Sequence, residues 1–381
     1  MKVAHIVRQY IPSIGGMEEV VRNLAGHQRQ RGTYLPSVIT LDRLFRAPDA
    51  ALPAEAVIDG IPVFRLGYRG SERYPFCPHV LQHLADYDLI HVHGVDFFFD
   101  FLSNTRWLHG KPLIASTHGG FFHTAYAARL KRIFFHSATR TSCLGYRRIV
   151  GTSQNDGDIF RAITSAPRLQ VIENGVDVDK FHEAGSPALR PAIVYFGRWS
   201  VNKGLHETLQ MFAALCARQP QEDWSLRILG REYDLSAEQL RQQAEQLGIS
   251  HQVHVHANPS NAEIREALAQ ASYFVSLSHH EGFGIAPIEA MSAGLQPLLS
   301  PIPPFEKLVR ETGCGLLLTD ADPVSQAVHI LQWHQRARQS GDVAYTECRR
   351  RAMNAAQRYS WSEVGRLYDQ QYAQVLGKDA A

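Results

Sequence analysis

The chain has 381 residues, of which 45% are hydrophobic and 20% are charged. This composition is that of a globular protein and excludes collagen-like, coiled-coil and wholly disordered chains. The 39 basic and 37 acidic residues give a net charge of +2, which is not the bulk charge of a nucleic-acid-binding protein. At roughly 100–200 residues per domain, the length predicts two or three domains.

Short apolar segments alternate with helical patterns along the whole chain. Because most of them are rich in Val, Ile and Leu without clean alternation, they are predicted to be strands buried on both faces of a sheet. The expected strands are Val3–Val7, Ser37–Leu41, Pro62–Leu66, Leu89–His93, Pro112–Ser116, Arg148–Thr152, Gln170–Ile172, Ala192–Phe196, Leu226–Leu229, Gln252–His256, Tyr273–Leu277, Pro297–Leu299 and Gly315–Leu318. Helical patterns between them include Glu18–Arg31, Leu205–Ala217, Ser236–Leu247 and Ala262–Ala269. Repeated strand–helix–strand units predict parallel sheets.

The strands are too numerous for one such sheet, and the series restarts near residue 190. The segment Glu183–Pro191 contains Gly and Pro residues and is predicted to be a linker. The predicted fold class is therefore α/β, with two Rossmann-like domains facing each other across a cleft. A ligand would bind in this cleft, at the carboxyl ends of both sheets. We predict a first domain over residues 1–184 and a second over residues 185–364.

The strongest chemical signal is the segment Glu281–Gly294, which follows an expected strand. Gly282 and Gly284 allow a tight turn and a close approach of the backbone to a ligand. The N–H groups at the start of the next helix suit an anion such as a diphosphate. The carboxylates of Glu281 and Glu289 could hold hydroxyls at two ends of one ligand. Alternatively, Glu281 only interacts favourably with the helix dipole.

A second motif, Arg198–Gly204, also joins an expected strand to a helix. Arg198 and Lys203 could clamp a diphosphate, with a forked contact from Arg and a point charge from Lys. Such a clamp would neutralise a departing nucleoside diphosphate without a metal ion. The alternative is a solvated loop with surface charges.

Two turns in the first half follow expected strands. One contains Gly15 and Gly16, and the chain has neither a dinucleotide-binding motif nor a phosphate-binding P-loop there or elsewhere. The other contains His118, which could hydrogen-bond a sugar hydroxyl or a donor phosphate. The plainer alternative is a histidine satisfied by local backbone.

No pattern in the sequence predicts a metal ion or another cofactor. Capping and turn roles explain the three Asp-x-Asp triplets, at residues 86–88, 177–179 and 320–322. The pairs His91/His93 and His254/His256 each point to one face of a strand, but no cysteines are spaced to complete a zinc site. The five cysteines form no Cys-x-x-Cys pair, which favours a reducing compartment.

The stretch between Asp100 and Asp156 contains eight basic residues and no acidic one. Aromatic and basic residues interleave there, which favours an anionic membrane surface or a lipid-linked diphosphate acceptor as the partner; they are Phe121, Phe122, Arg129, Lys131 and Arg132. A solvated basic helix is the alternative, and no nucleic-acid-binding motif accompanies the charge. We find neither a signal-peptide core nor a spanning segment, and therefore expect a cytoplasmic protein at the inner face of the cell membrane.

Together, the motifs at Gly15-Gly16, Thr117–Gly119, Asn174–Asp177, Arg198–Gly204 and Glu281–Glu289 resemble those of the retaining glycosyltransferases of family 4. The resemblance spans nearly the whole chain and keeps the family's motif order. It implies the GT-B architecture, with the final helix crossing back so that residues 365–381 complete the first domain.

The resemblance also implies residue roles. Arg198 and Lys203 would hold the donor diphosphate, and Glu289 the ribose hydroxyls. Glu281 would contact the transferred sugar, whereas His118 would lie near the reaction centre. The backbone of the segment formed by Gly282, Phe283, Gly284 and Ile285 would line the sugar and phosphates, and Gly15 and Gly16 would let a loop approach the donor phosphate.

Within the family, the segments Val7–Val21, Gly67–Ser71, His118–Tyr126 and Gly197–Gly204 resemble the mannosyltransferases of xanthan- and acetan-type exopolysaccharide assembly. This likeness implies GDP-mannose as donor, cellobiosyl-diphosphopolyprenol as acceptor and an α-1,3 linkage. Three alternatives stay open: another donor or lipid-linked acceptor, a sugar-nucleotide epimerase, and a non-catalytic sugar-nucleotide or polyanion-binding protein. The oligomeric state is not predicted.

Overall fold

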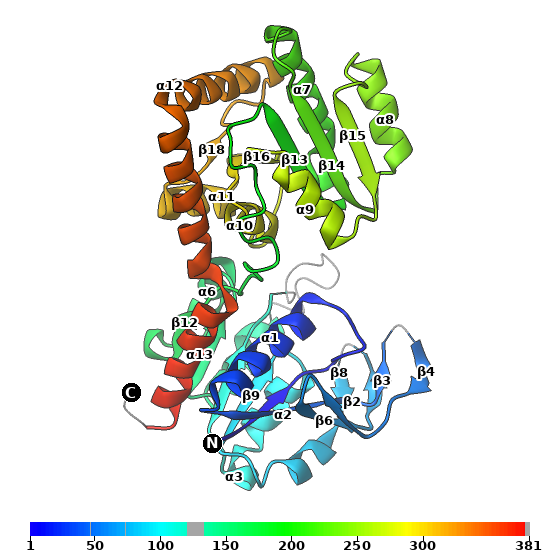
Figure 1. Ribbon diagram of the computed structural model, residues 1–381. Helices are drawn as coiled ribbons and strands as arrows, with labels where there is room; N and C mark the ends of the chain where they lie inside the picture. Colours follow the sequence, from blue (N-terminus) through cyan, green and yellow to red (C-terminus); the bar gives the residue numbers. More distant parts are fainter. Residues whose placement is uncertain (46, 73, 120–132, 378–381) are drawn as a thin grey trace. The chain divides into compact units, whose positions relative to one another are not determined.

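The computed structural model describes residues 1–45, 47–72, 74–119 and 133–377. The chain divides into two compact units, one formed by Met1–Gly175 with Trp361–Ala381 and the other by Val176–Ser360. Each unit is built on a parallel sheet with helices packed against it (Figure 1). The predicted α/β class with two Rossmann-like units is thereby confirmed.

The boundary between the units differs from the predicted one. It lies before Val176 instead of after residue 184, and the chain returns to the first unit after residue 360 instead of 364. The predicted linker Glu183–Pro191 is packed inside the second unit, where the N–H of Gly185 donates to the carbonyl of Ala293 at 2.8 Å. A Cβ at Gly185 would lie 2.6 Å from that carbonyl oxygen. Gly185 is therefore needed here for close packing. A segment rich in Gly and Pro can be either a packed segment or a linker, and composition alone does not distinguish the two.

The sheet of the first unit has the strand order β12-β11-β10-β9-β1-β2-β6-β5, with only β5 antiparallel to its neighbour. Its strands are β1 (Lys2–Ile6), β2 (Leu35–Leu41), β5 (Glu55–Ile58), β6 (Ile61–Leu66), β9 (Leu89–His93), β10 (Leu113–Ser116), β11 (Arg148–Gly151) and β12 (Leu169–Val171). Two small antiparallel pairs lie beside it: β3 (Arg43–Leu44) with β4 (Ala47–Ala51), and β7 (Arg69–Ser71) with β8 (Tyr74–Phe76). The helices are α1 (Gly16–Arg31), α2 (Phe97–Asn104), α3 (Arg106–His109), α5 (Arg140–Cys143), α6 (Gln154–Arg161) and α13 (Trp361–Val375).

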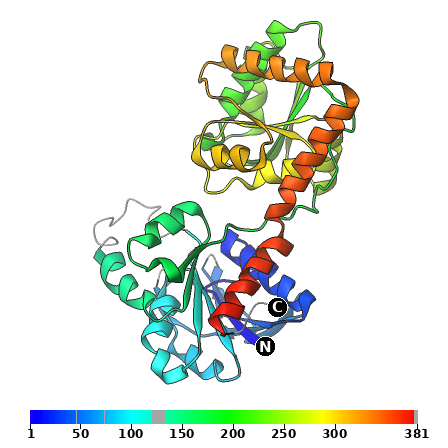
Figure 2. The same cartoon turned by 90° about the vertical axis from the view of Figure 1, so that its left-hand side faces the viewer.

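Successive residues of β1 face opposite sides of this sheet. Ala4 and Ile6 enter a core with α2 and α6, whereas Val3 and Val7 face the side covered by α1 and α13. The last helix, α13, therefore packs beside α1 in the first unit although it comes last in the chain (Figure 2).

The sheet of the second unit has the order β15-β14-β13-β16-β17-β18 and is parallel throughout. Its strands are β13 (Ala192–Trp199), β14 (Ser225–Glu232), β15 (Val253–Ala257), β16 (Tyr273–Ser276), β17 (Gln296–Leu299) and β18 (Leu316–Leu317). Its helices are α7 (Leu205–Arg218), α8 (Ala237–Gln246), α9 (Asn261–Ala269), α10 (Ile285–Ser292), α11 (Pro303–Thr312) and α12 (Pro323–Ala356), which kinks at Gly341.

Both faces of this second sheet are covered. Ile193 and Tyr195 of β13 pack with α7 and α8, whereas Val194 and Phe196 pack with α9 and α10. Burial on both faces is why the strands are continuous apolar runs. The candidate site lies at the carboxyl ends of these strands and in the loops after them.

Candidate active site

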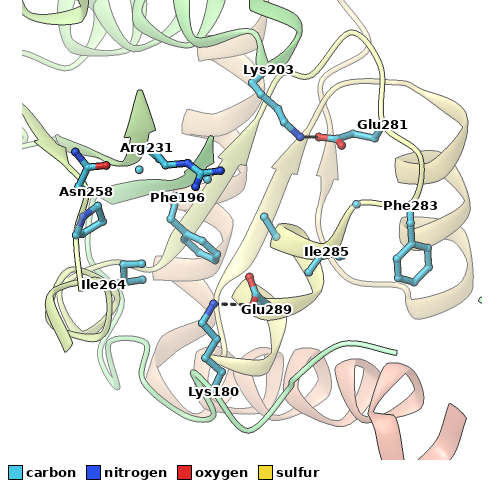
Figure 3. Close-up of a pocket in the computed structure, with 15 residues that line it drawn as sticks. Lys180, Phe196, Lys203, Arg231, Asn258, Ile264, Glu281, Phe283, Ile285 and Glu289 are labelled. Carbon is cyan, nitrogen blue, oxygen red and sulfur yellow. Dashed lines mark hydrogen bonds and ion pairs between the residues drawn. The ribbon is translucent and has the colours of Figure 1, made fainter. Parts of the chain in front are cut away.

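A cavity of about 620 Å³ opens in the second unit, at the carboxyl ends of β13 and β14 and the amino end of α10 (Figure 3). It is lined by Lys180, Phe196, Gly197, Lys203, Gly230, Arg231, Asn258, Pro259, Ile264, Glu281, Phe283, Gly284, Ile285, Ala286 and Glu289. Six residues assigned from the sequence are therefore in one cavity wall: Lys203, Glu281, Phe283, Gly284, Ile285 and Glu289. Gly282 does not line the cavity, although both its neighbours do.

Lys203 and Glu281 form an ion pair at one end of the cavity (Figure 3). The Lys203 Nζ lies 2.5 Å from Oε1 of Glu281, and the Ser278 hydroxyl donates to the same oxygen at 2.9 Å. The two charged side chains keep only 20% and 15% of their surface exposed. Burial at this level makes their pairing stronger than that of a surface ion pair.

Asn202 connects the two loops that carry this pair, although they are far apart in sequence. Its carbonyl accepts from the N–H of His279 at 2.8 Å, and its side-chain amide donates to the carbonyl of His280 at 3.1 Å. These bonds explain why the Arg198–Gly204 turn and the Glu281 loop share one site. Neither His279 nor His280 lines the cavity, and His279 pairs with Glu207 instead.

A second ion pair lies at the other end of the cavity. The Nζ of Lys180 is 3.1 Å from Oε1 of Glu289, which projects from α10 (Figure 3). The sequence assigned Glu289 but not Lys180, because a single lysine three residues after an Asn-Gly-Val-Asp motif has no distinguishing pattern. The N–H of Lys180 bonds to Asp177 at 3.1 Å, so this turn aspartate helps to place the lysine.

The first turn of α10 lies between the two ion pairs. Gly284 is its N-cap with φ of +91°, and a Cβ there would lie 2.8 Å from a ring carbon of Phe305. Only glycine meets both conditions at this position. The first N–H groups of a helix have no intrahelical acceptor, so this turn offers donors to an anion in the cavity.

Arg231, Asn258 and Phe196 form the wall opposite α10 (Figure 3). Arg231 and its neighbour Glu232 are the last two residues of β14. The structure separates them, because Glu232 accepts from the N–H of Ala237 at 2.6 Å and thereby caps α8. Of these two residues, only Arg231 lines the cavity.

Arg198 does not line the cavity, although the sequence paired it with Lys203. Trp199 is completely buried, and alternation along β13 turns Arg198 to the solvent side. Its guanidinium carbon lies 4.5 Å from the ring centroid of Tyr233, a cation–π contact. The two predicted clamp residues therefore have different partners in this structure, since Lys203 pairs with Glu281 and Arg198 contacts Tyr233.

Gly15, Gly16 and His118 lie in the first unit, at the carboxyl ends of β1 and β10. Gly15 is the N-cap of α1, and a Cβ there would lie 2.5 Å from the Glu18 carboxylate. Apart from its chain neighbours and its own helix, no atom of the described residues lies within 4 Å of the Cβ position of Gly16.

His118 adopts an unusual backbone conformation, with φ of +54°. The buried carboxylate of Asp156 holds the loop around it, since one oxygen accepts from the Thr117 hydroxyl at 2.8 Å and from the Gly119 N–H at 2.9 Å. Strain of this kind persists only when the surroundings impose it. Asp156 is thus a positioning residue that the sequence did not reveal.

The His118 ring is bonded to another histidine, with its Nε2 2.9 Å from Nδ1 of His93. Burial lowers the pKa of His118 from 6.5 to about 3. The ring is therefore neutral at physiological pH, and it can accept a hydrogen bond from a sugar hydroxyl without carrying charge.

In the described part of the chain, one group of side chains could hold a metal ion: His5, His91 and His93, whose ligand atoms lie within 4.8 Å of one another. Both ring nitrogens of each already have a protein partner, among them Gln28 and Tyr372. The three histidines therefore belong to a hydrogen-bonded network.

The residues predicted to face the acceptor or membrane lie outside the described residues; they are Phe121, Phe122, Arg129, Lys131 and Arg132. Among the helices that are described, none is both long and apolar enough to cross a membrane.

Two family models match the chain: "Glycosyltransferase Family 4" over residues 14–180 and "Glycosyl transferases group 1" over residues 178–351. The chain therefore belongs to these glycosyltransferases, and the resemblance stated from its motifs is confirmed. It is 48% identical to the GDP-mannose:cellobiosyl-diphosphopolyprenol alpha-mannosyltransferase of Xanthomonas campestris, over 99% of this chain and 98% of the relative. The enzyme of the same name from Komagataeibacter xylinus is 43% identical over 99% and 94%.

Solved structures support the fold. A glycosyltransferase from Rickettsia africae superposes with a TM-score of 0.72 at 14% identity, covering 99% of both chains. Anabaena HepE, in complex with UDP and glucose, superposes with a TM-score of 0.66 at 18% identity, covering 98% of this chain and 100% of its own.

Proposed function

We propose that the protein is a retaining mannosyltransferase that moves an α-mannosyl group from GDP-mannose to a polyprenyl-diphosphate-linked cellobiose, forming an α-1,3 linkage in exopolysaccharide repeat-unit assembly. The observation that carries the proposal is 43–48% identity, over 99% of the chain, to enzymes named for this donor and acceptor. The charged cavity of the second unit supplies the groups that a sugar nucleotide requires.

The donor would occupy this cavity with its diphosphate at the first turn of α10 and at Lys203. Glu289 would take the ribose hydroxyls and Glu281 the mannose. The guanine base would then lie toward Arg231, whose guanidinium suits the two acceptors on the edge of guanine. Each carboxylate is paired with a lysine, which fixes its position.

Transfer would proceed on one face of the mannose. The acceptor hydroxyl forms the new bond to the anomeric carbon while the bond to the diphosphate breaks, and a phosphate oxygen takes the hydroxyl proton. Lys203 and Arg198 would stabilise the charge that develops on the diphosphate, so no metal ion or other cofactor is required. We assign no carboxylate pair of the glycosidase kind, in which one member is a nucleophile.

Association with the inner face of the cell membrane is part of the proposal. In the structure, two ends of the acid-free stretch meet at a cavity of about 370 Å³ whose wall includes Arg106, Lys111, Arg147 and Arg168 and no acidic residue. Large apolar side chains are exposed nearby, at Trp107, Leu108 and Leu144. Cations beside exposed apolar side chains suit an anionic lipid surface. This cavity is at the amino end of β10, whereas His118 follows its carboxyl end.

The donor is tested by calorimetric titration with GDP, UDP and ADP, followed by product analysis with GDP-mannose in the absence of acceptor. Binding of GDP at least tenfold tighter than that of UDP supports the guanine assignment. Preference for UDP would overturn it and point to another donor. A new sugar nucleotide formed without acceptor would identify an epimerase, and binding without any turnover when acceptors are supplied would identify a non-catalytic protein.

A further inference from the structure

Three imidazole rings form a continuous hydrogen-bonded chain that runs from Gln28 of α1 to His118 after β10. The Nε2 of His5 lies 2.9 Å from Oε1 of Gln28, and its Nδ1 lies 3.0 Å from Nε2 of His93. The Nδ1 of His93 then lies 2.9 Å from Nε2 of His118. His5, His93 and Gln28 are completely buried.

Strand register explains why these rings meet. β1 and β9 are parallel neighbours in which His5 is paired with His91, and alternation places His93 on the same face. This face is covered by α1 and α13, and the neighbouring positions on it are apolar, such as Val3 and Leu89. Polar rings in an apolar layer must satisfy one another.

His91 belongs to a separate branch. Its Nδ1 lies 2.7 Å from the Tyr372 hydroxyl and its Nε2 lies 2.8 Å from the Ser116 hydroxyl, which in turn bonds to Tyr368 at 3.0 Å. Both of its nitrogens are therefore occupied without His5 or His93, and the chain to His118 runs through His5 and His93 only.

The rings of this chain are neutral. Burial lowers the pKa of His5 to about 4 and that of His118 to about 3, and holds the pKa of His93 well below its usual range. A neutral imidazole has one N–H donor and one acceptor nitrogen. A chain of such rings must therefore point all its protons in one direction.

The direction follows from the orientation of the Gln28 amide, which turns its carbonyl oxygen, an acceptor only, toward His5. An amide turned the other way would present an N–H donor and reverse the chain. His5 donates from Nε2 to Gln28, so its Nδ1 must accept from Nε2 of His93. The Nδ1 of His93 must then accept from Nε2 of His118. His118 is left with a lone pair on Nδ1, for which the described residues offer no partner.

We propose that Gln28, His5 and His93 are positioning residues that hold His118 in the tautomer protonated at Nε2, so that its Nδ1 accepts a hydrogen bond from a hydroxyl of the transferred sugar. The sugar contact rests on the proposed function. The direction of the proton chain does not, because it follows from the interior of the first unit alone.

The test is long-range proton–nitrogen NMR on protein labelled with ¹⁵N-histidine, which distinguishes protonated from unprotonated ring nitrogens. In the wild-type protein at pH 7, His5, His93 and His118 should all be protonated at Nε2 and unprotonated at Nδ1. Protonation of His118 at Nδ1, an equal mixture of tautomers, or a metal ion bound in stoichiometric amount to these rings would each overturn the proposal. Resonances are assigned with single His→Gln variants.

The variant Gln28→Met removes the accepting oxygen at similar side-chain length. The tautomers of all three rings should then become mixed, and kcat for mannosyl transfer should fall by about twofold or more with little change in the KM for the donor. The matched control is Gln30→Met, at an exposed position of the same helix, which should retain the wild-type tautomers and kcat. Unchanged tautomers in Gln28→Met would contradict the assignment of Gln28.

The two proposals fail separately. If the protein transfers no mannose but the three rings are protonated at Nε2, the proton chain stands and the proposed function fails. If transfer proceeds while the His118 tautomers are mixed, the proton chain fails and the proposed function stands.

Discussion

Lys203 and Glu281 form an ion pair at one end of the candidate donor site, with 2.5 Å between Nζ and Oε1. Lys180 and Glu289 repeat this arrangement at the other end of the cavity. In each pair a carboxylate suited to hydroxyl groups is joined to a cation, which keeps the buried charges compensated. A donor entering the cavity would add its diphosphate to a site whose carboxylates are already held in place.

The first prediction concerns Lys203. The variant Lys203→Ala should lower kcat by roughly 10²–10³-fold, the scale for loss of one strong electrostatic donor to a developing charge. It also leaves Glu281 without its cation, so the KM for the donor should rise. Steady-state kinetics provide the measurement, with Lys307→Ala, from a surface ion pair on α11, as the control. Near-wild-type turnover of Lys203→Ala would remove Lys203 from the mechanism.

The second prediction concerns Arg198, whose guanidinium contacts Tyr233 and does not line the cavity. If it joins the donor diphosphate during turnover, Arg198→Ala should also lower kcat by roughly 10²–10³-fold, whereas Arg310→Ala on α11 should have no effect. A fully active Arg198→Ala enzyme would show that Lys203 and α10 hold the diphosphate without it.

The third prediction separates the roles of Lys180 and Glu289. Glu289→Gln removes the charge that accepts ribose hydroxyls, and should weaken GDP binding by roughly 10- to 150-fold, since hydrogen bonds to charged groups contribute about 1.5–3 kcal/mol. Lys180→Met should weaken it less, because the carboxylate remains. Calorimetric titration with GDP measures both. Tighter binding by Glu289→Gln would contradict the ribose contact.

Membrane association gives the fourth prediction. The wild-type protein should sediment with anionic vesicles at low salt, and Arg129→Glu combined with Lys131→Glu and Arg132→Glu should release it while donor hydrolysis is unchanged. Arg106→Glu with Lys111→Glu tests the second cavity in the same way. The control is Lys307→Glu with Arg310→Glu on α11. Equal sedimentation of all variants would exclude this basic stretch as the contact.

The fifth prediction concerns stability in acid. Burial lowers the pKa of His5 from 6.5 to about 4 and of His118 to about 3, so the unfolded chain binds more protons than the folded one below pH 6.5. Stability should therefore fall as the pH is lowered from about 6.5 to 4, by about 1.4 kcal/mol per unit of pKa shift. Asp96 acts in the opposite sense, because burial raises its pKa from 3.8 to about 6.

Urea unfolding at pH 7, 6 and 5 measures this dependence. In the variant His93→Gln, the free energy of unfolding should fall less steeply as the pH is lowered, because one buried histidine has been removed. The exposed His79→Gln should retain the wild-type dependence. If the free energy of unfolding rises when the pH is lowered from 6.5 to 5, the buried histidines do not dominate the pH dependence of stability.

The sequence predicted much of the fold because the sheets are buried on both faces. Each of the thirteen expected strands is present, and helix patterns such as Leu205–Ala217 agree closely with α7. The antiparallel strand β5 and the pairs β3–β4 and β7–β8 were missed, because strands as short as Arg43–Leu44 are too brief to show a period.

The site was only partly predictable for a different physical reason. Glu281 and Lys203 stand in loops with distinctive glycines, so local sequence marked them. Alternation also placed His91 and His93 on one face, but it could not show which helix covers that face. Gln28 and Asp156 therefore stayed unrecognised until the tertiary structure brought them to the rings and the loop that they hold.

The most direct test of the account is transfer from labelled GDP-mannose to a synthetic cellobiosyl-diphosphate lipid, with and without EDTA. The account predicts a mannosylated trisaccharide lipid with an α-1,3 linkage, formed at the same rate in both reactions. A lipid product that disappears with EDTA would contradict the metal-free site, and no lipid product under either condition, while another sugar nucleotide is transferred, would contradict the assigned donor.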